Sequence, residues 1–237
     1  MASANALPRT TSGNDKVLRT PGCNQVSIRI KELSERDRRR LLMHFLALGE
    51  SDRLLRFGNV LSDELVTRYV QRLNFARDAI FGVFDADLRL VGVGHLGFVP
   101  CDTKPALTNA TEKECVAEFG VSVLAHARGC GIGGKLFERA AIHCRNEDID
   151  TLYMHCLSSN QTMIHIARKA GMEIHRSHGE TDAYLKLTPA NPSSMLQEAV
   201  EEQVASLDYT IRANTRAAAK WLAQLPSHLP SFKDEAK

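Results

Sequence analysis

Apolar and polar side chains first alternate at residues 25–31, Gln-Val-Ser-Ile-Arg-Ile-Lys, a pattern typical of a half-buried strand. A capping-box-like segment at residues 34–37 then precedes a helix that Gly49 can end. The apolar stripe of this helix consists of Leu41, Leu42, Phe45 and Leu48. A second helix is predicted to begin at Ser62. The apolar residues of its inner face are Leu65, Val66, Tyr69, Val70 and Leu73.

Strand-like and helix-like segments follow one another through the middle of the chain. The segments predicted as strands are residues 80–84, 89–98, 115–123, 151–156, 172–175 and 183–187. Helices are predicted at residues 131–145 and 160–170, and a loop at residues 100–113. Hairpin-linked strands followed by strands interleaved with helices predict an α/β (α+β) fold, a mixed sheet with one parallel crossover in its second half.

Beyond Pro189 and Pro192 the pattern changes to one long helix over residues 194–225. Its apolar positions are spaced alternately by four and three residues, as in a coiled-coil seam, with one polar position. The seam consists of Val200, Val204, Leu207, Ile211, Asn214, Ala218, Trp221 and Leu225. Two interpretations stay open: the seam packs on the domain's own sheet or helices, or it joins a second copy of the chain in a homodimer.

These patterns divide the chain into four parts. Residues 1–24 are rich in Ser, Thr, Asn and Pro and lack a hydrophobic stretch of signal-peptide type, which predicts a disordered leader. The other predicted parts are a folded domain (25–189), a C-terminal amphipathic helix (190–226) and a tail (227–237).

The composition is that of a folded domain, with 43% hydrophobic and 24% charged residues in a chain of 237. Thirty Lys and Arg residues against 28 Asp and Glu give a net charge of +2, too balanced for a broad nucleic-acid-binding surface. The basic run at residues 36–40 lies in a predicted helix and is interpreted as a solvated face. No apolar stretch approaches the roughly 18 residues that span a bilayer. We expect a cytoplasmic protein with no nucleic-acid or membrane partner.

The six cysteines are scattered and form no Cys-x-x-Cys pair, so we expect reduced thiols in a reducing compartment. They are Cys23, Cys101, Cys115, Cys130, Cys144 and Cys156. The tightest histidine pair, His175 and His178, is weak evidence for a metal, and no metal site is predicted.

Four glycines stand between the predicted strand at 115–123 and the helix at 131–145, in the sequence Arg-Gly-Cys-Gly-Ile-Gly-Gly-Lys-Leu of residues 128–136. Backbone amides at such a helix start bind phosphate groups, although a connection without a ligand is the plainer alternative. A dinucleotide site would need the strand to run straight into Gly129 and an acidic residue after the next strand, and neither is present. A Walker A loop would need Ser or Thr where Leu136 stands.

The acyl-CoA pyrophosphate sets a third requirement: Gln or Arg, two residues, Gly, one residue, then Gly or Ala. Residues 128–133 meet it at every position. Here the chain resembles the GNAT superfamily of N-acetyltransferases over about residues 27–188. Three further segments, residues 51–57, 117–123 and 160–172, are similar to elements of bacterial protein-lysine acetyltransferases of this class. The resemblance implies a mixed, mostly antiparallel sheet flanked by helices, and acetyl-CoA as co-substrate.

The resemblance also assigns roles to single residues. It places the catalytic glutamate at Glu118, in an otherwise apolar strand where partial burial would favour a general base; an outward-facing surface glutamate is the alternative. Free amides of the splayed strand, at residues 121–123, would bind the pantetheine arm and the thioester carbonyl. Asn160 would contact pantetheine, cap the next helix, or do both. The residues expected to bind acetyl-CoA are Val121, Ser122, Val123, Arg128, Gly129, Cys130, Gly131, Ile132, Gly133, Gly134 and Asn160.

One position departs from the pattern. Many GNAT members carry a tyrosine that protonates the leaving thiolate, and this chain has Ala167 there. Tyr153, Tyr184 or a water molecule remain as proton donors, although both tyrosines also suit a structural role.

The leading hypothesis is therefore an N-acetyltransferase that acts on a protein lysine or a small-molecule amine. An acyl-CoA-binding regulatory or assembly module with weak catalysis is the alternative.

Overall fold

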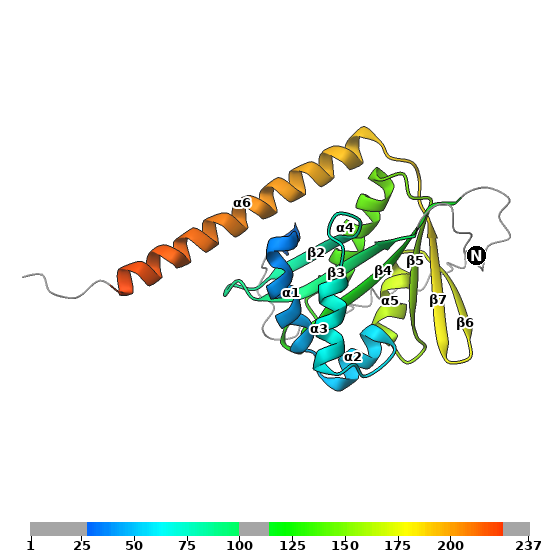
Figure 1. The fold of residues 1–237 in the computed structure, drawn as a ribbon. Helices are drawn as coiled ribbons and strands as arrows, with labels where there is room; N and C mark the ends of the chain where they lie inside the picture. The colour runs from blue at the N-terminus through cyan, green and yellow to red at the C-terminus, as the bar shows by residue number, and fades with distance from the viewer. Residues whose placement is uncertain (1–27, 100–113, 225–237) are drawn as a thin grey trace, which may run out of the picture.

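The computed structural model describes residues 28–99 and 114–224 of the chain. The leader predicted at 1–24, the loop at 100–113 and the tail at 227–237 lie outside these residues. A seven-stranded sheet in the order β1-β2-β3-β4-β5-β7-β6 forms the centre of the fold (Figure 1). Its strands are β1 (Ile30–Glu32), β2 (Ala79–Phe84), β3 (Leu90–Phe98), β4 (Val116–Val123), β5 (Thr151–Leu157), β6 (Glu173–Ser177) and β7 (Glu180–Lys186). Only β4 and β5 pair in parallel, which confirms the mixed, mostly antiparallel sheet with one parallel crossover.

Six α-helices and two short 3-10 turns are described. They are η1 (Glu35–Asp37), α1 (Arg38–Leu46), α2 (Glu50–Phe57), α3 (Asp63–Arg72), η2 (Ala125–Ala127), α4 (Ile132–Asn146), α5 (Gln161–Lys169) and α6 (Pro192–Ala223). The hydrophobic pattern did not predict α2 as a separate helix, because its eight residues include only three apolar side chains, Leu54, Leu55 and Phe57, too few to show a helical period. Gly49, predicted to end the first helix, is also the N-cap of α2, so the chain turns there directly from one helix into the next.

The helices cover both faces of the sheet. In Figure 1, α1 and α3 lie on one face and α4 and α5 on the other. Neighbouring residues of a strand point to opposite faces, and in β2 Ile80 packs with α1 and α3 whereas Phe81 packs with α4. Two cores therefore share the sheet, and both faces of its central strands are apolar.

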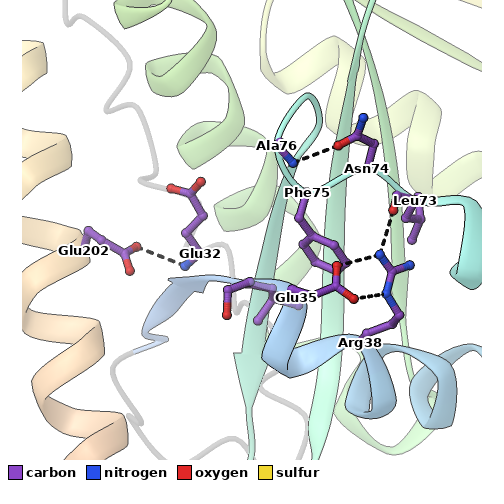
Figure 2. Close-up of a pocket in the computed structure, with 10 residues that line it drawn as sticks. Glu32, Glu35, Arg38, Leu73, Asn74, Phe75, Ala76 and Glu202 are labelled. Atoms are coloured by element: carbon purple, nitrogen blue, oxygen red, sulfur yellow. Dashed lines mark hydrogen bonds and ion pairs between the residues drawn. The ribbon is translucent and has the colours of Figure 1, made fainter.

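A cavity of about 670 Å³ lies where β1, the end of α3 and α6 meet (Figure 2). Arg38, the cation that lines the cavity, donates to both carboxylate oxygens of Glu35, at 2.5 and 2.7 Å, and to the carbonyl of Leu73 at 2.9 Å. Glu202 accepts from the backbone amide of Glu32 at 3.0 Å. The guanidinium of Arg38 is therefore already satisfied within the protein.

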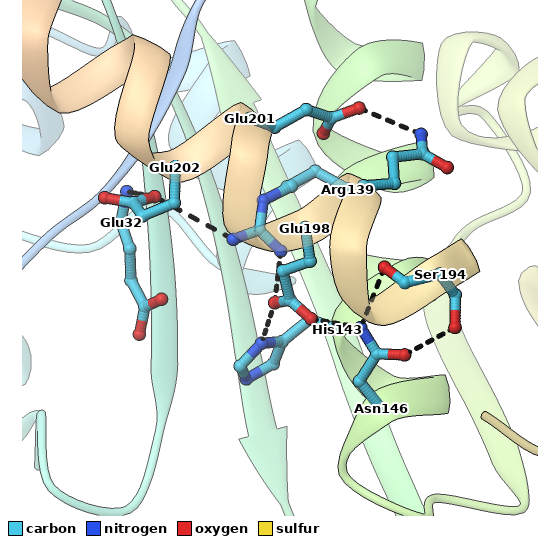
Figure 3. A network of polar contacts seen from close by, with 9 residues as sticks. Glu32, Arg139, His143, Asn146, Ser194, Glu198, Glu201 and Glu202 are labelled. Atoms are coloured by element: carbon cyan, nitrogen blue, oxygen red, sulfur yellow. Dashed lines mark hydrogen bonds and ion pairs between the residues drawn. The ribbon is translucent and has the colours of Figure 1, made fainter. Parts of the chain in front are cut away.

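A polar network attaches α6 to α4 (Figure 3). Arg139 of α4, whose side chain is 2% exposed, donates to Glu198 of α6 at 2.5 Å. Glu198 also contacts His143 at 2.6 Å and accepts from Asn146. Burial by itself would raise the pKa of Glu198, but the hydrogen bonds from His143, Arg139 and Asn146 outweigh it and lower the pKa to about 2. The network therefore keeps Glu198 ionised beside a buried guanidinium.

The seam of α6 does not pack on the domain, which excludes the first of its two interpretations. Val200 is 52% exposed, Leu207 60% and Ile211 63%. The opposite face of the helix, which includes Ala205 and Tyr209, packs on the sheet and α4. The end of α6, beyond the ion pair of Arg216 with Asp87, extends past the sheet (Figure 1). The spacing of apolar residues could not show which face of α6 packs on the domain, because the packed face is held largely by the polar contacts of Figure 3.

The cysteines differ from expectation at one position. Cys115 is disulfide-bonded, so the prediction that all six are reduced is wrong for this residue. Cys144 and Cys156 are buried free thiols. None of the helices in the described part of the chain is both long and apolar enough to cross a membrane.

Candidate active site

Strands β4 and β5 separate partway along their length. Their parallel ladder consists of three pairs and ends where Glu118 faces Tyr153. Beyond this point β4 continues against β3 as far as Val123, and β5 continues against β7 as far as Leu157. A gap therefore opens inside the sheet next to residues 119–123, a stretch that includes residues 121–123, which were predicted to splay.

Some backbone amides of β4 point into this gap. Backbone groups of a strand alternate between its two sides, and the amide of Leu124 donates to Val91 on the β3 side at 2.9 Å. The amides of Val121 and Val123 consequently face the other side, where β5 has moved away. Among the described strands they have no ladder partner, so they are donors directed at whatever occupies the gap.

Glu118 stands at the closed end of the gap. Its neighbour Phe119 packs against Phe137 of α4, with ring centroids 5.4 Å apart, so Glu118 points to the opposite face of the sheet. Its partner on β3 is Gly97, which has open space above it. The side chain of Glu118 is exposed, so the partial burial expected from the apolar strand is absent. Among residues 28–99 and 114–224, no helix covers this part of that face.

The start of α4 lies at the other end of the gap. Gly131 is its N-cap, with φ +80°, a left-handed conformation that glycine adopts without strain. The first intrahelical bond runs from the amide of Lys135 to Gly131, at 3.0 Å. The amides of Ile132, Gly133 and Gly134 therefore precede the hydrogen-bonded part of the helix, and the positive end of its dipole lies beside them.

Two side chains hold the ends of the gap in place. Arg128 pairs with Asp52 of α2 at 2.7 Å and donates to the carbonyl of Val123 at 3.0 Å, which ties the glycine-rich turn to β4. Asn160 caps α5 by accepting from the amide of Met163 at 3.2 Å, and its amide group donates to Leu55 of α2 at 3.4 Å. The structure thus shows the capping role of Asn160.

A groove of about 1070 Å³ joins these features. All residues predicted to bind acetyl-CoA line it: Val121, Ser122, Val123, Arg128, Gly129, Cys130, Gly131, Ile132, Gly133, Gly134 and Asn160. Phe137 and Ile166 line it from the face of α4 and α5, whereas Leu48 and Arg56 line it from the face of α1 and α2. The groove therefore passes through the sheet at the gap, and the gap is reached from both faces.

The hydroxyl of Ser122 is already engaged within the protein, and its backbone groups face β3 rather than the gap. The hydroxyl lies 2.8 Å from Nε2 of His44, while Nδ1 of His44 lies 2.9 Å from the carbonyl oxygen of Leu90. Burial lowers the pKa of His44 to about 4. A neutral imidazole that donates to Leu90 through Nδ1 accepts from Ser122 through Nε2, so both polar groups are satisfied within the protein.

A cluster of polar and aromatic side chains follows Glu118 across the sheet. Tyr153, the partner of Glu118, donates its hydroxyl to Asp182 at 2.5 Å and packs on Tyr184 with ring centroids 5.1 Å apart. His155 contacts the same carboxylate at 2.9 Å. Burial, together with the hydrogen bond to Asp182, raises the pKa of Tyr153. The tyrosine is held in place beside Glu118, with its proton directed away to Asp182.

The sequence indicated many of the residues that line the groove, but not all of them. Residues 51–57 were recognised as a motif, but nothing in the pattern placed Arg56 against β4. The pairs His44–Ser122 and Tyr153–Asp182 join residues far apart in the chain, and no local signal connects them. Within residues 28–99 and 114–224, no group of three or more His, Cys, Asp or Glu side chains is arranged to hold a metal ion.

Comparison with known proteins identifies the fold. Residues 51–172 match the model of the acetyltransferase (GNAT) family. The GNAT domain of S. lividans PAT is 19% identical with a TM-score of 0.54, over 67% of this chain and 89% of that one. Arabidopsis thaliana NAA60, solved with a bisubstrate analogue, is 12% identical with a TM-score of 0.53, over 69% and 100%. Spermidine N-acetyltransferase from Vibrio cholerae, solved with CoA and spermine, is 18% identical with a TM-score of 0.50, over 67% and 95%. No curated protein sequence matches the chain.

Proposed function

The chain belongs to the acetyltransferase (GNAT) family, whose enzymes use acetyl-CoA as co-substrate, and from this premise we propose that it transfers an acetyl group to a primary amine with Glu118 as general base. The acceptor is a protein lysine or a small-molecule amine. The observation that carries the proposal is the gap between β4 and β5, which opens at Glu118 and is continuous with the start of α4. A thioester can enter it from the face of α4 while an amine approaches from the face of Glu118.

The amides that open α4 suit the pyrophosphate of acetyl-CoA. Three of them precede the first intrahelical bond, and the helix dipole favours an anion at this point. The pantetheine arm would then run along the gap, with its amides and the thioester carbonyl facing the free amides of Val121 and Val123. Asn160 would border the same path.

Glu118 supports the reaction by accepting a proton. An alkylammonium has a pKa of about 10.4, so deprotonation at pH 7 costs roughly 4 to 5 kcal/mol before attack can occur. The neutral amine attacks the thioester carbon, the carbon–sulfur bond breaks, and CoA leaves as a thiolate. The amide product keeps the acetyl group, and the amine proton passes to Glu118 and on to solvent.

Water is the proton donor for the leaving thiolate that best fits the surroundings. Ala167, at the position of the usual tyrosine, carries no acid. Burial raises the pKa of both Tyr153 and Tyr184, and Tyr153 already donates to Asp182. A hydroxyl with a raised pKa gives up its proton less readily, whereas the open groove admits solvent.

A screen of acceptors tests this function. The purified chain is incubated with acetyl-CoA and a panel of lysine-containing peptides, polyamines and amino sugars, and mass spectrometry looks for a mass gain of one acetyl group. We expect at least one amine to be modified in a protein-dependent manner. If CoA binds but no amine is modified, the alternative function, an acyl-CoA-binding regulatory or assembly module, would be favoured.

Substitution of Gly131 is expected to weaken CoA binding. A valine at φ +80° would carry roughly 1 to 2 kcal/mol of backbone strain, which the first turn of α4 can relieve only by moving its amides. Because a Cβ at this position meets nothing within 4 Å, the effect comes from conformation and not from a clash. We expect the Kd of CoA to rise by roughly 10-fold in Gly131→Val, measured by calorimetry.

Gly179 supplies the matched control. It has φ +87°, also meets nothing within 4 Å, and lies in the hairpin between β6 and β7, away from the start of α4. Gly179→Val should lower Tm without changing the Kd of CoA. An equal rise of Kd in both variants would mean that Gly131 acts only through general stability.

The exposed seam of α6 suits a second copy of this chain, because a heptad spacing is self-complementary and its polar position at Asn214 can fix the register. We expect the mass measured by light scattering to rise with concentration toward a dimer. Leu207→Glu should keep the chain monomeric, since it places a charge in the middle of the seam. Met43→Glu, at a residue of α1 that is 63% exposed, should leave the mass unchanged. A parent chain that stays monomeric at high concentration would contradict the homodimer.

A further inference from the structure

The guanidinium of Arg56 lies directly on the backbone of β4, beside the gap. Arg56 belongs to α2 and also lines the groove. A Cβ built on Gly120 would come within 2.8 to 2.9 Å of the guanidinium carbon and both of its terminal nitrogens. Residue 120 must therefore lack a side chain for the arginine to reach this place. Gly120 is two residues from Glu118 on the same face of the strand and adjacent to Val121, whose amide faces the gap.

The surroundings of Arg56 are apolar and offer it little hydrogen bonding. Three aromatic rings lie 5.2 to 6.0 Å from its guanidinium carbon: Phe45, Phe57 and Tyr69. Within the described part of the chain its guanidinium makes one hydrogen bond, to the hydroxyl of Tyr69 at 3.2 Å, and its Nε is buried without a partner. Among the described residues no carboxylate lies within ion-pair distance of it.

Arg53, one turn earlier on α2, shows what a purely structural arginine looks like here. It donates to the carbonyls of Leu46, Leu48 and Leu61 at 2.8 to 3.0 Å and pairs with Asp63 at 2.7 Å. A half-buried cation that lacks such partners is costly unless an anion joins it. Arg56 is thus a positive charge facing the groove with unused donors.

We propose that Arg56 binds the oxygen on which negative charge develops when the amine attacks the thioester. This rests on the proposed acetyl transfer. As the nitrogen lone pair forms the new bond to the carbonyl carbon, the electron pair of the carbonyl moves onto its oxygen. The guanidinium and the amide of Val121 would both donate to that oxygen. When the carbonyl re-forms and the thiolate leaves, Arg56 keeps all of its protons.

Arg56 lies on the face of Glu118, from which the acceptor would approach, but two observations favour the thioester oxygen over a carboxylate of the acceptor. Its guanidinium rests on β4 at the residue before Val121, on the wall of the gap. An acceptor would approach from the side of Glu118 and Tyr153, where Asp182 and Glu118 would repel a carboxylate.

Two stable analogues of the thioester test the proposal without relying on turnover. One is a CoA thioether that ends in a neutral methyl ketone, and the other ends in a phosphonate, which carries charged oxygens. Calorimetry gives the Kd of each for the parent chain and for Arg56→Ala, Arg56→Lys and Gly120→Ala. We expect the parent to prefer the phosphonate, and the preference to fall by roughly 10-fold or more in Arg56→Ala. In Gly120→Ala the new Cβ displaces the guanidinium of Arg56 without removing its charge, so the preference for the phosphonate should fall in this variant too.

Kinetics with an acceptor that has no carboxylate supply the second readout. Arg56→Ala should lower kcat by roughly 100-fold, the effect of removing a donor to a developing oxyanion, with little change in the KM of acetyl-CoA. Added guanidinium ions should restore part of kcat. Arg53→Lys serves as the control for stability, because it should lower Tm without changing the phosphonate preference. Should Arg56→Ala fail to fold, Gly120→Ala carries the same comparison.

Three results would overturn the inference. The first is a phosphonate preference that persists in Arg56→Ala, and the second is an equal loss of that preference in Arg53→Lys. The third is an effect of Arg56→Ala confined to a higher KM for acceptors that carry a carboxylate, which would assign Arg56 to binding the acceptor. A parent chain that binds CoA and acetylates amines while showing any of these retains the proposed function. A parent chain that binds neither analogue overturns both.

Discussion

Replacing Glu118 by glutamine is expected to lower kcat by roughly 10²- to 10⁴-fold, the contribution typical of a general base. Glutamine has the same shape but cannot accept the proton of an ammonium. The side chain is exposed beside Gly97 and Tyr153, so the change leaves no cavity and no buried group unpaired. Stability and CoA affinity should therefore stay at the parent values, and the loss should appear in the chemical step. Initial rates with acetyl-CoA and an amine that the protein acetylates measure the loss of kcat, and Tm measures stability.

Glu173 provides a control of the same residue type on the same face. It pairs with Tyr184, which pairs with Tyr153, the partner of Glu118, so the two glutamates lie in one row across the sheet. Glu173 is exposed and lies beyond the gap. We expect Glu173→Gln to retain kcat within about 2-fold. If Glu118→Gln keeps more than half of the parent activity, Glu118 is a surface residue and the base lies elsewhere.

Replacing Glu198 by alanine is expected to lower the free energy of unfolding by about 3 to 5 kcal/mol at pH 7, the usual result of breaking a buried ion pair. Arg139, 2% exposed, would lose its closest counter-ion and keep only Glu202 at 3.8 Å. His143 and Asn146 would each lose a contact as well. Urea unfolding of both proteins measures the difference. Glu201→Ala is the matched control, because Glu201 is exposed on the same helix and accepts a hydrogen bond from the exposed side chain of Gln197, so its effect should stay below about 1 kcal/mol.

The pH dependence of this difference has a definite sign. The pKa of Glu198 falls from an ordinary 4.5 to about 2 in the folded protein, so the unfolded chain takes up the proton first as the pH drops. The stabilisation is present above about pH 4.5 and is lost as the pH falls to about 2; it is at most about 3 kcal/mol, because solvent partly screens this half-buried carboxylate. Burial raises the pKa of Glu202, which acts in the opposite sense. The difference in the free energy of unfolding between the parent and Glu198→Ala should be smaller at pH 3 than at pH 7. An equal difference at both pH values would exclude this ion pair as its source.

The glycine-rich turn shows how much of the site a sequence can predict. The strand expected at 115–123 and the helix expected at 131–145 agree with β4 and α4 to within one residue at each end. Both carry strong periodic patterns, and the turn between them needs glycine at a left-handed position, Gly131. Local signals of this kind survive folding because tertiary contacts reinforce them.

Features that depend on which faces are covered were less predictable. Glu118 was expected to be partly buried because its neighbours are apolar, yet those neighbours point to the face of α4 and Glu118 does not. The seam of α6 has the period of a buried stripe and is exposed, because Arg139 and Glu198, 59 residues apart, decide which side of the helix packs. Neither outcome has a signature within one helix or strand.

The role proposed for Arg56 is the part of the site that the sequence indicates least. Its place in the segment at 51–57 is visible in the sequence, as is Gly120 in the strand, but neither residue indicates the other. Only the fold brings the guanidinium to within 2.9 Å of the place that a side chain at residue 120 would occupy. A pair of this kind, one residue that must be present and one that must be absent, requires the structure to be seen.

The measurement that tests the account most directly is a calorimetric titration of the unmodified chain with coenzyme A and, separately, with pantetheine, which lacks the pyrophosphate. If the amides that open α4 hold the pyrophosphate, coenzyme A should bind at least roughly 100-fold more tightly, since two or more hydrogen bonds to a charged group are involved. Equal affinity for the two ligands, or no binding of coenzyme A, would contradict it.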